Sequence, residues 1–304
     1  MFRLNTTIDI VRQLCIEATL TLSFSYEKCG TSANGILESR MPRPNAASQL
    51  RIVSLAPSAT SILCAIGARS SLVGVTRWCA DVAPVKHLPK FGDCWKLESV
   101  PQILKLKPDL VIGSVPFKTE TLGKLLEHPL RFLAINPRRI ADIEADIRVV
   151  AGLVGRLSAA SHVIRKMRKE FASLHGSARR NPKLRVYFEA WPNPRITSPP
   201  WVAEIAEMCG TEFVGTPGAR ISDEDVASSN PDVIVLAWAA TGDRAKPKSC
   251  YELAAWKDVA AIKNRRVFVI QDELLNTPAP ILIRGARELA KVLSKSQAQM
   301  ARRP

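Results

Sequence analysis

The stretch RIVSLAPSATSILCAIGARSSLVGV, residues 51–75, decides the fold class of this chain. An apolar run over Ile52–Leu55 breaks at Pro57, and a helical pattern follows until Gly67. A second apolar run covers Leu72–Val75. Strand, helix and strand in this order predict a parallel α/β unit. The helix would begin at the carboxyl end of the first strand, where open α/β sheets bind ligands.

Local signals at both ends of this helix support the prediction. Ser58 or Thr60 is expected to cap its first turn, and Gly67 is expected to end it in a left-handed conformation. No glycine-rich phosphate loop precedes the helix, so its first turn is interpreted as the wall of a ligand cleft.

The composition indicates a globular protein with an unusual charge. The chain has 304 residues, of which 46% are hydrophobic and 23% charged, and this length can bury a sizeable core. No run reaches the roughly 18 apolar residues that a membrane helix needs. The net charge of +15 favours anionic partners or surfaces, including nucleic acid and lipid headgroups. Because the basic residues are scattered and no nucleic-acid-binding motif is present, nucleic acid is not the expected partner.

Seven cysteines show neither a CxxC pair nor zinc-ligand spacing. Cys64 and Cys209 fit helical apolar patterns and are expected in the core. Cys79 and Cys94, each beside a tryptophan, could come close in space, and their redox state stays open. The odd count favours a reducing compartment.

Five segments are expected. Residues 1–47 are interpreted as disordered or as an over-extended gene start, with a degraded export signal as the alternative. Two α/β lobes with mainly parallel sheets should cover residues 50–137 and 183–294, and a long connector helix should cover residues 138–178. Residues 295–304 form a basic tail.

The two lobes show the same order of elements. Each has a strand, a loop with a helix, a Pro-Asp pair before a buried strand, a further helix and a last strand; the pairs are Pro108-Asp109 and Pro231-Asp232. The periodicity of residues 139–175 predicts one helix of about 35 residues, roughly 50 Å long, with Gly152 and Gly155 as its weak points.

Several motifs, in order, carry a resemblance to a known family. They are RIVSLAPSATSILCAIGA, LVGVTRWCADVAP, ILKLKPDLVIG, NPDVIVLAW, WKDVAAIKNRRVFVI and PAPILIRGARELAKVL. From about residue 50 to 294 the chain resembles the helical-backbone (class III) periplasmic substrate-binding proteins of ABC importers, most closely those that bind cobalamin (vitamin B12). The resemblance implies two Rossmann-like lobes joined by a stiff helix, a ligand between them, and no enzymatic activity.

The tryptophans direct the choice of ligand. Cobalamin is a large, mostly apolar corrinoid edged with amides, so aromatic faces and polar groups suit it. The expected contacts are Ser58, Trp78, Trp95, Trp191, Trp201, Trp238 and Asn276. The family resemblance places an aromatic residue after the second strand, where Trp78 stands, and Trp191 holds the corresponding loop of the second lobe.

Other ligands stay open as alternatives. A free metal ion is not expected, because the four histidines are scattered. A ferric siderophore or haem could pair its anionic groups with Arg77, Arg195 or Arg244. An intracellular protein that stores or senses a corrinoid is a further alternative.

The family also implies docking on ABC permease subunits through one carboxylate per lobe. Glu224 matches the position in the second lobe, while the first-lobe position holds Pro101, with Glu98 three residues earlier. The protein is expected to be a monomer. The resemblance implies a periplasmic location, but the sequence shows no convincing signal peptide or lipid-attachment motif, so a cytoplasmic location stays open as the alternative. No nucleophile motif or phosphate loop supports an enzyme, and Asp109 and Asp232 are interpreted as turn residues.

Overall fold

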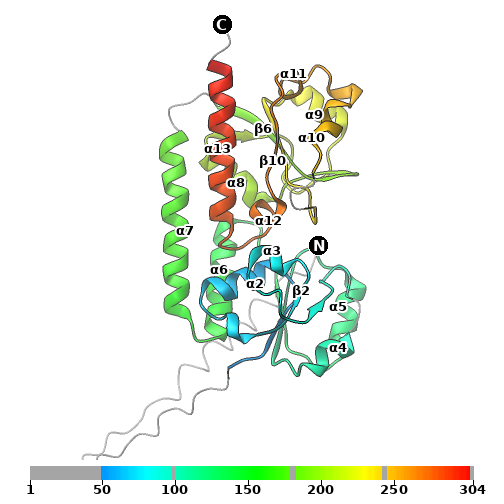
Figure 1. The fold of residues 1–304 in the computed structure, drawn as a ribbon, viewed down its shortest axis with the longest axis vertical. Helices are drawn as coiled ribbons and strands as arrows, with labels where there is room; N and C mark the ends of the chain where they lie inside the picture. The colour runs from blue at the N-terminus through cyan, green and yellow to red at the C-terminus, as the bar shows by residue number, and fades with distance from the viewer. Residues whose placement is uncertain (1–48, 98–99, 179–182, 242–244, 302–304) are drawn as a thin grey trace, which may run out of the picture. The chain divides into compact units, whose positions relative to one another are not determined.

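The computed structural model describes residues 49–97, 100–178, 183–241 and 245–301. The expectation for residues 1–47 lies outside these ranges. The described chain is an α/β structure with two separate sheets, one in each predicted lobe (Figure 1). This confirms the predicted fold class.

The sheet of the first lobe is entirely parallel, with strand order β3-β2-β1-β4-β5. Its strands are β1 (Ile52–Ser54), β2 (Leu72–Thr76), β3 (Lys90–Phe91), β4 (Leu110–Ser114) and β5 (Phe132–Ile135). Strand β1 lies in the middle and is fully buried, as its apolar sequence predicts.

The sheet of the second lobe has the order β10-β9-β6-β7, with β8 also pairing with β6. Its strands are β6 (Leu184–Pro192), β7 (Arg195–Thr197), β8 (Thr211–Phe213), β9 (Val233–Leu236) and β10 (Val267–Val269). All pairs are parallel except β6 and β7, which form an antiparallel hairpin. This hairpin is not among the elements predicted from the sequence.

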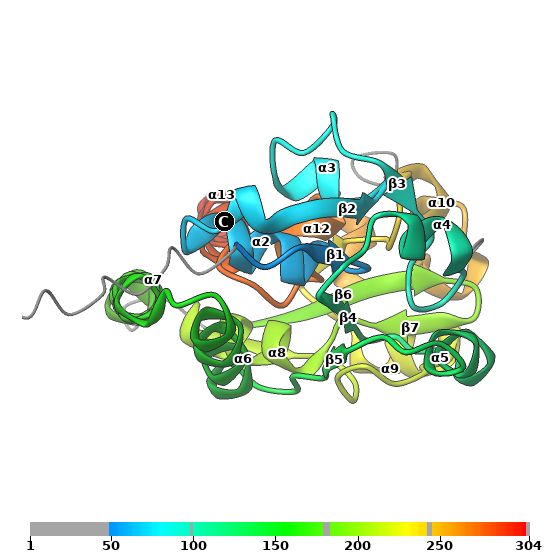
Figure 2. The same cartoon turned by 90° about the horizontal axis from the view of Figure 1, so that it is seen from below.

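Helices flank both sheets (Figures 1 and 2). The first lobe carries α2 (Pro57–Ala65), η1 (Arg69–Ser71), α3 (Cys79–Val82), α4 (Val100–Lys105) and α5 (Thr119–Leu126), followed by α6 (Ile140–Leu153) and α7 (Leu157–Ala178). The second lobe carries α8 (Pro200–Met208), α9 (Asp223–Ser229), α10 (Pro247–Tyr251), η2 (Ala254–Trp256), α11 (Ala260–Lys263), α12 (Asp272–Leu275) and α13 (Leu282–Ala301). None of the helices in the described ranges is both long and apolar enough to cross a membrane.

The first turn of α2 differs from the prediction. Its N-cap is Ala56, Pro57 follows at the first helical position, and no side chain caps the turn. Thr60 instead donates its hydroxyl hydrogen to Ser54 Oγ at 2.9 Å, inside the protein. The cap position falls on Ala56, which has no side-chain acceptor, and Pro57 leaves one N–H group fewer to satisfy at this end of the helix.

The end of α2 is as predicted. Gly67 has φ +74°, and the N–H of Ala68 donates to the carbonyl oxygen of Leu63 at 2.7 Å. This pattern is a Schellman motif, which favours glycine at the left-handed position.

The single connector helix expected over residues 139–175 is wrong, because the chain forms two helices there. Helix α6 ends at Leu153, Gly155 has φ +66°, and the N–H of Arg156 donates to the carbonyl oxygen of Ala151 at 2.7 Å. Helix α7, of 22 residues, then leads toward the second lobe. The same Schellman geometry that ends α2 therefore ends α6.

The two helices lie side by side (Figure 1), and an ion pair holds them together. Arg168 of α7 donates from Nε to Oε1 of the nearly buried Glu144 at 2.8 Å. The long connecting element is thus α7, stiffened by its neighbour α6.

Two further expectations near the C-terminus also change. The further helix expected before the last strand of the second lobe is instead the series α10, η2 and α11, separated by short turns. Helix α13 continues to Ala301, so residues 295–301 belong to it rather than to a separate tail.

The main hydrophobic core is continuous across both lobes. It contains side chains of the first lobe such as Ile62 and Ile147 together with Val202 and Ile205 of the second. A carboxylate of α8 also binds the first turn of α6, since Glu204 Oε2 accepts from the N–H of Ile140 at 2.9 Å. The described lobes accordingly belong to one compact unit.

Candidate ligand-binding site

The carboxyl end of β2 positions the aromatic residue expected there. Trp78 follows Thr76, the last residue of the strand, and its ring is partly buried. The guanidinium carbon of Arg77 lies 4.3 Å from the centre of the Trp78 ring, within the range of a cation–π contact.

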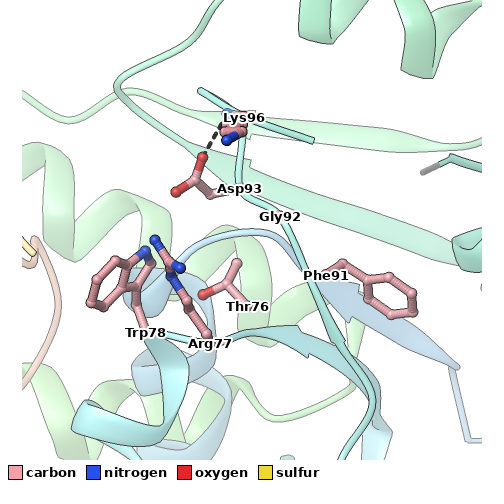
Figure 3. Close-up of a pocket in the computed structure, with 7 residues that line it drawn as sticks. All are labelled: Thr76, Arg77, Trp78, Phe91, Gly92, Asp93 and Lys96. Atoms are coloured by element: carbon pink, nitrogen blue, oxygen red, sulfur yellow. Dashed lines mark hydrogen bonds between the residues drawn. The ribbon is translucent and has the colours of Figure 1, made fainter. Parts of the chain in front are cut away.

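A small cavity of about 90 Å³ opens beside these side chains (Figure 3). It is lined by Thr76, Arg77, Trp78, Phe91, Gly92, Asp93 and Lys96. An aromatic ring and two cations therefore meet at the carboxyl edge of this sheet, where ligands of open α/β sheets bind.

A tight turn after β3 presents Trp95 to solvent. The Asp93 carboxylate accepts from the backbone N–H groups of Trp95 at 2.9 Å and Lys96 at 2.8 Å. A Cβ on Gly92 would lie 1.9 Å from the Lys96 carbonyl oxygen, so only glycine fits at that position. The Trp95 side chain is 57% exposed and is available for stacking.

Polar groups beneath Trp78 are satisfied internally. Thr60 Oγ1 lies 3.1 Å from Cys79 Sγ, and Thr76 Oγ1 lies 3.2 Å from the same sulfur. Burial raises the pKa of the Cys79 thiol, so it is a protonated structural group. Cys79 and Cys94 lie in different core clusters, and both are free thiols.

A buried carboxylate organises the corresponding edge of the second lobe. Glu189 of β6 is fully buried, and its Oε1 accepts from the indole N–H of Trp238 at 2.8 Å. Its Oε2 accepts from the Tyr187 hydroxyl at 2.8 Å and from Arg195 Nη1 at 2.6 Å. The sequence analysis missed this network, although an acidic residue within the apolar strand LRVYFEAW was a signal for it.

Arg195 connects the network to α9. It donates to the Asp223 carboxylate as well as to Glu189, and its guanidinium carbon lies 4.4 Å from the centre of the Trp256 ring. Burial opposes the charge of Arg195, but its bonds to Asp223 and Glu189 outweigh burial and raise its pKa. This guanidinium is therefore fully engaged within the protein.

Trp191 lies on the β6–β7 hairpin rather than in the expected loop. Its indole N–H donates to the Asn193 carbonyl oxygen at 2.8 Å, and its side chain is 41% exposed. This hydrogen bond fixes one edge of the indole ring, and part of the ring stays exposed to solvent.

Trp201 occupies a different kind of environment. It is 5% exposed within the main core, and its indole N–H donates to the Leu275 carbonyl oxygen at 2.9 Å. We therefore assign Trp201 to packing between α8 and α12, and we leave it out of the ligand contacts proposed below.

Several buried polar atoms form no hydrogen bond within the described part of the chain, and three of them bear on the expected site. These three are Ser58 Oγ in the first turn of α2, Ser198 Oγ just before α8, and Asn276 Oδ1. Asn276 Nδ2 donates to the Ala237 carbonyl oxygen at 2.6 Å, so the amide is held in place. Because an unsatisfied buried polar atom is costly, each is a place for a water or ligand hydrogen bond.

Acidic groups of the two lobes face each other near α3 and α12. Burial, then Asp272 of the same helix and Asp81 of α3, raise the pKa of Glu273.

A larger open cavity of about 540 Å³ adjoins α3. It is lined by Ala80, Asp81, Val82, Ala83, Pro84, Lys86, His87 and Arg284.

The comparison with protein-family models decides the class. The model described as "Periplasmic binding protein" matches residues 52–274, which is most of the chain and spans both sheets. This chain belongs to the periplasmic binding protein family. It is a substrate-binding protein of the ABC-transporter type, with a small-molecule ligand and permease partners as its class implies.

The named relatives of this periplasmic binding protein include one whose name states no ligand and one named for vitamin B12. The chain is 26% identical over 254 residues to the uncharacterized ABC transporter substrate-binding lipoprotein YvrC of Bacillus subtilis, covering 79% of both chains. It is 24% identical over 249 residues to the vitamin B12-binding protein of Vibrio parahaemolyticus, covering 79% of this chain and 88% of that protein.

Solved structures show the same fold. A periplasmic heme binding protein from Pseudomonas aeruginosa superposes with a TM-score of 0.72 at 22% identity, covering 82% of this chain and 94% of that one. At this identity, the likeness shows the fold alone.

The expected docking residues have different outcomes. Glu224 is exposed in the first turn of α9, where Ser222 Oγ caps the helix by accepting from the Asp225 N–H at 3.0 Å. Glu98 and Arg244 lie outside the described residues. In the described ranges, no group of three or more His, Cys, Asp or Glu residues is arranged to hold a metal ion.

Proposed function

We propose that this periplasmic binding protein takes cobalamin or a related corrinoid between its two lobes and delivers it to an ABC importer. Trp78 and Trp95 would contact the ligand from the first lobe, and Trp191 and Trp238 from the second. Ser58 and Asn276 would hydrogen-bond to the amides of the corrinoid. No catalytic step is part of this role, and the protein acts as a monomer.

One observation carries the proposal: partly exposed tryptophans lie at the carboxyl edges of both sheets. Trp95 is 57% exposed and Trp191 is 41% exposed, while Trp78 and Trp238 are partly buried. A flat apolar ligand can stack on such rings. The unsatisfied atoms of Ser58 and Asn276 add the few polar contacts that fix its orientation.

The charges favour a corrinoid over a ferric siderophore. A strongly anionic siderophore requires several free guanidinium groups. Arg195, one of the three candidates, is bound by Glu189 and Asp223, and Arg77 lies on the Trp78 ring. Cobalamin, whose charge is confined largely to one phosphate, requires fewer cations.

Isothermal titration of the purified chain with cyanocobalamin, hemin and a ferric siderophore tests this choice. We expect a saturable signal with cyanocobalamin at nanomolar to micromolar concentration, and a corrinoid absorbance that co-elutes with the protein. Binding of hemin or the siderophore without any corrinoid binding would reject the ligand while keeping the family assignment.

Glu224 is our proposed contact with the permease on the second lobe. Its carboxylate is exposed in the first turn of α9, where it is free to meet an arginine of a partner. A Glu224→Gln variant should bind ligand normally and lose transport in a reconstituted system. If the variant and the natural chain support equal transport, the role of Glu224 is to stabilise the first turn of α9 rather than to contact the permease.

A further inference from the structure

The outward face of α6 is apolar where a solvent-facing helix surface is normally polar. Ala141, Ala145, Val149 and Leu153 recur at four-residue spacing, and all four are exposed. Val149 is 48% exposed and Leu153 45%. Because the opposite face of α6 is already buried in the core, this second apolar stripe has no partner among the residues that the structure describes.

Leu157 extends the stripe past the turn between α6 and α7. It is 57% exposed. A Cβ at Gly152 would lie 3.9 Å from Leu157 Cδ2, so the leucine folds back over α6. Val149, Leu153 and Leu157 together form what we call the apolar tip.

Cations surround the apolar tip. Arg148 and Arg156 are exposed beside it, one before the turn and one within it. The exposed cations of α7 continue the basic surface; they are Arg165, Lys166, Arg168 and Lys169.

The carboxylates of this region are largely neutralised or directed inward. Glu144 accepts from Arg168 and also lies 3.8 Å from Arg148 Nη2, so two exposed arginines share one buried carboxylate; Glu170 pairs with Arg287 of α13. Asp142 binds the backbone N–H groups at the far end of α6, and Asp146 is half-buried. The exposed charge near the tip is therefore positive.

We propose that the apolar tip and its surrounding cations bind the surface of a membrane that contains anionic lipids. Val149, Leu153 and Leu157 would enter the headgroup layer, and Arg148 and Arg156 would meet lipid phosphates. Apolar side chains combined with nearby arginines are the chemistry of interfacial membrane binding.

Two other occupants fit these observations less well. A stable protein interface buries about 1,200–2,000 Å², far more than three half-exposed side chains offer. A second copy would also bring Arg148 and Arg156 against themselves. Nucleic acid would satisfy the cations but leave the apolar side chains in water.

Membrane binding at this tip leaves the ligand site free. Helix α6 starts after the carboxyl end of β5 and runs for 14 residues, so its last turn lies about 20 Å from that edge. The inference does not depend on which ligand the protein binds, and ligand affinity serves as an internal check that variants are folded.

Vesicle sedimentation of the full chain tests the proposal. We expect binding to vesicles of phosphatidylcholine with phosphatidylglycerol, and about tenfold weaker binding to phosphatidylcholine alone. Leu153→Ser with Leu157→Ser should lower the partition coefficient about tenfold, and Arg148→Gln with Arg156→Gln should have a similar effect.

Matched controls come from the other exposed residues of the chain. Leu126 at the end of α5 is 66% exposed, and Figure 2 shows α5 on the opposite side of the first lobe from α6 and α7. Leu126→Ser and Arg220→Gln should leave vesicle binding unchanged. The proposal would be overturned if these controls lost as much vesicle binding as the tip variants, or if the natural chain showed no preference for anionic vesicles. It would also be overturned if the natural chain formed dimers in sedimentation velocity and the tip variant did not.

Discussion

At the scale of single residues, different contacts hold the tryptophans at the two sheet edges. Trp78 is the N-cap residue of α3 and contacts Arg77 on its face, whereas the indole N–H of Trp191 donates to the Asn193 carbonyl oxygen within the β6–β7 hairpin. Both rings are available to a flat ligand. Trp78→Ala and Trp191→Ala should each weaken corrinoid binding by about 1–3 kcal/mol, measured by titration calorimetry.

The control for these variants is Leu126→Ala, which removes an exposed apolar side chain away from both sheet edges. It should leave affinity unchanged. Unchanged affinity in both tryptophan variants would assign Trp78 and Trp191 to loop packing instead.

Glu189 gives a second prediction at this scale, because it is the shared acceptor of three donors inside the second lobe. Glu189→Gln leaves Arg195 partly buried with one carboxylate fewer, and breaking a buried ion pair costs about 3–5 kcal/mol. Urea unfolding should show most of that loss. Glu120→Gln removes the partner of Lys118 in a fully exposed pair and should cost about 0–1 kcal/mol.

At the scale of elements, the turn between α6 and α7 shows what the sequence could and could not predict. The apolar period of residues 139–175 is nearly unbroken, so it predicted one helix. The decisive signal was Gly155, whose left-handed conformation allows the Schellman bonds that end α6. Periodicity identifies helical segments, but a single glycine within them decides whether the chain continues or turns back.

Two glycines three residues apart test this explanation. Gly155 has φ +66°, so Gly155→Ala should cost about 1–2 kcal/mol of unfolding free energy. Gly152 lies within α6, and a Cβ added there would lie 3.9 Å from the nearest other atom. Gly152→Ala should therefore raise the free energy of unfolding by about 0.5–1 kcal/mol. Effects of the same sign in thermal or urea unfolding would contradict the assigned turn.

Helix α6 also carries a pH-dependent group. Burial, then the charge of Asp142, raise the pKa of Asp146 to about 6. Because the folded-state pKa is the higher one, the protonated form contributes stability below about pH 4, and this contribution is lost as the pH rises through about 6. Relative to Asp146→Asn, the natural chain should lose on the order of 1–2 kcal/mol between pH 4 and 7. Parallel curves for the two proteins would contradict this.

At the scale of the whole molecule, local pattern determined the fold and tertiary contacts determined the site. Apolar strands, Pro-Asp turns and the order of motifs were enough to predict two mainly parallel sheets. The sequence alone does not distinguish the environments of the five tryptophans expected to bind ligand. In the structure Trp201 packs in the core, while Trp238 donates a hydrogen bond to Glu189. Sequence position places a side chain near a sheet edge, but neighbours distant in sequence decide whether it faces inward or outward.

The shared core leads to a last prediction about how the lobes unfold. Ile62 of α2 and Ile205 of α8 are fully buried in one continuous cluster, although they belong to different lobes. Glu204 further ties α8 to the first turn of α6. We therefore expect a single urea transition, coincident by circular dichroism and tryptophan fluorescence. Ile62→Ala and Ile205→Ala should each shift this same transition by about 2–5 kcal/mol. If the lobes fold independently, each substitution would instead move only one of two separate transitions, and the continuous core would not be the element that couples them.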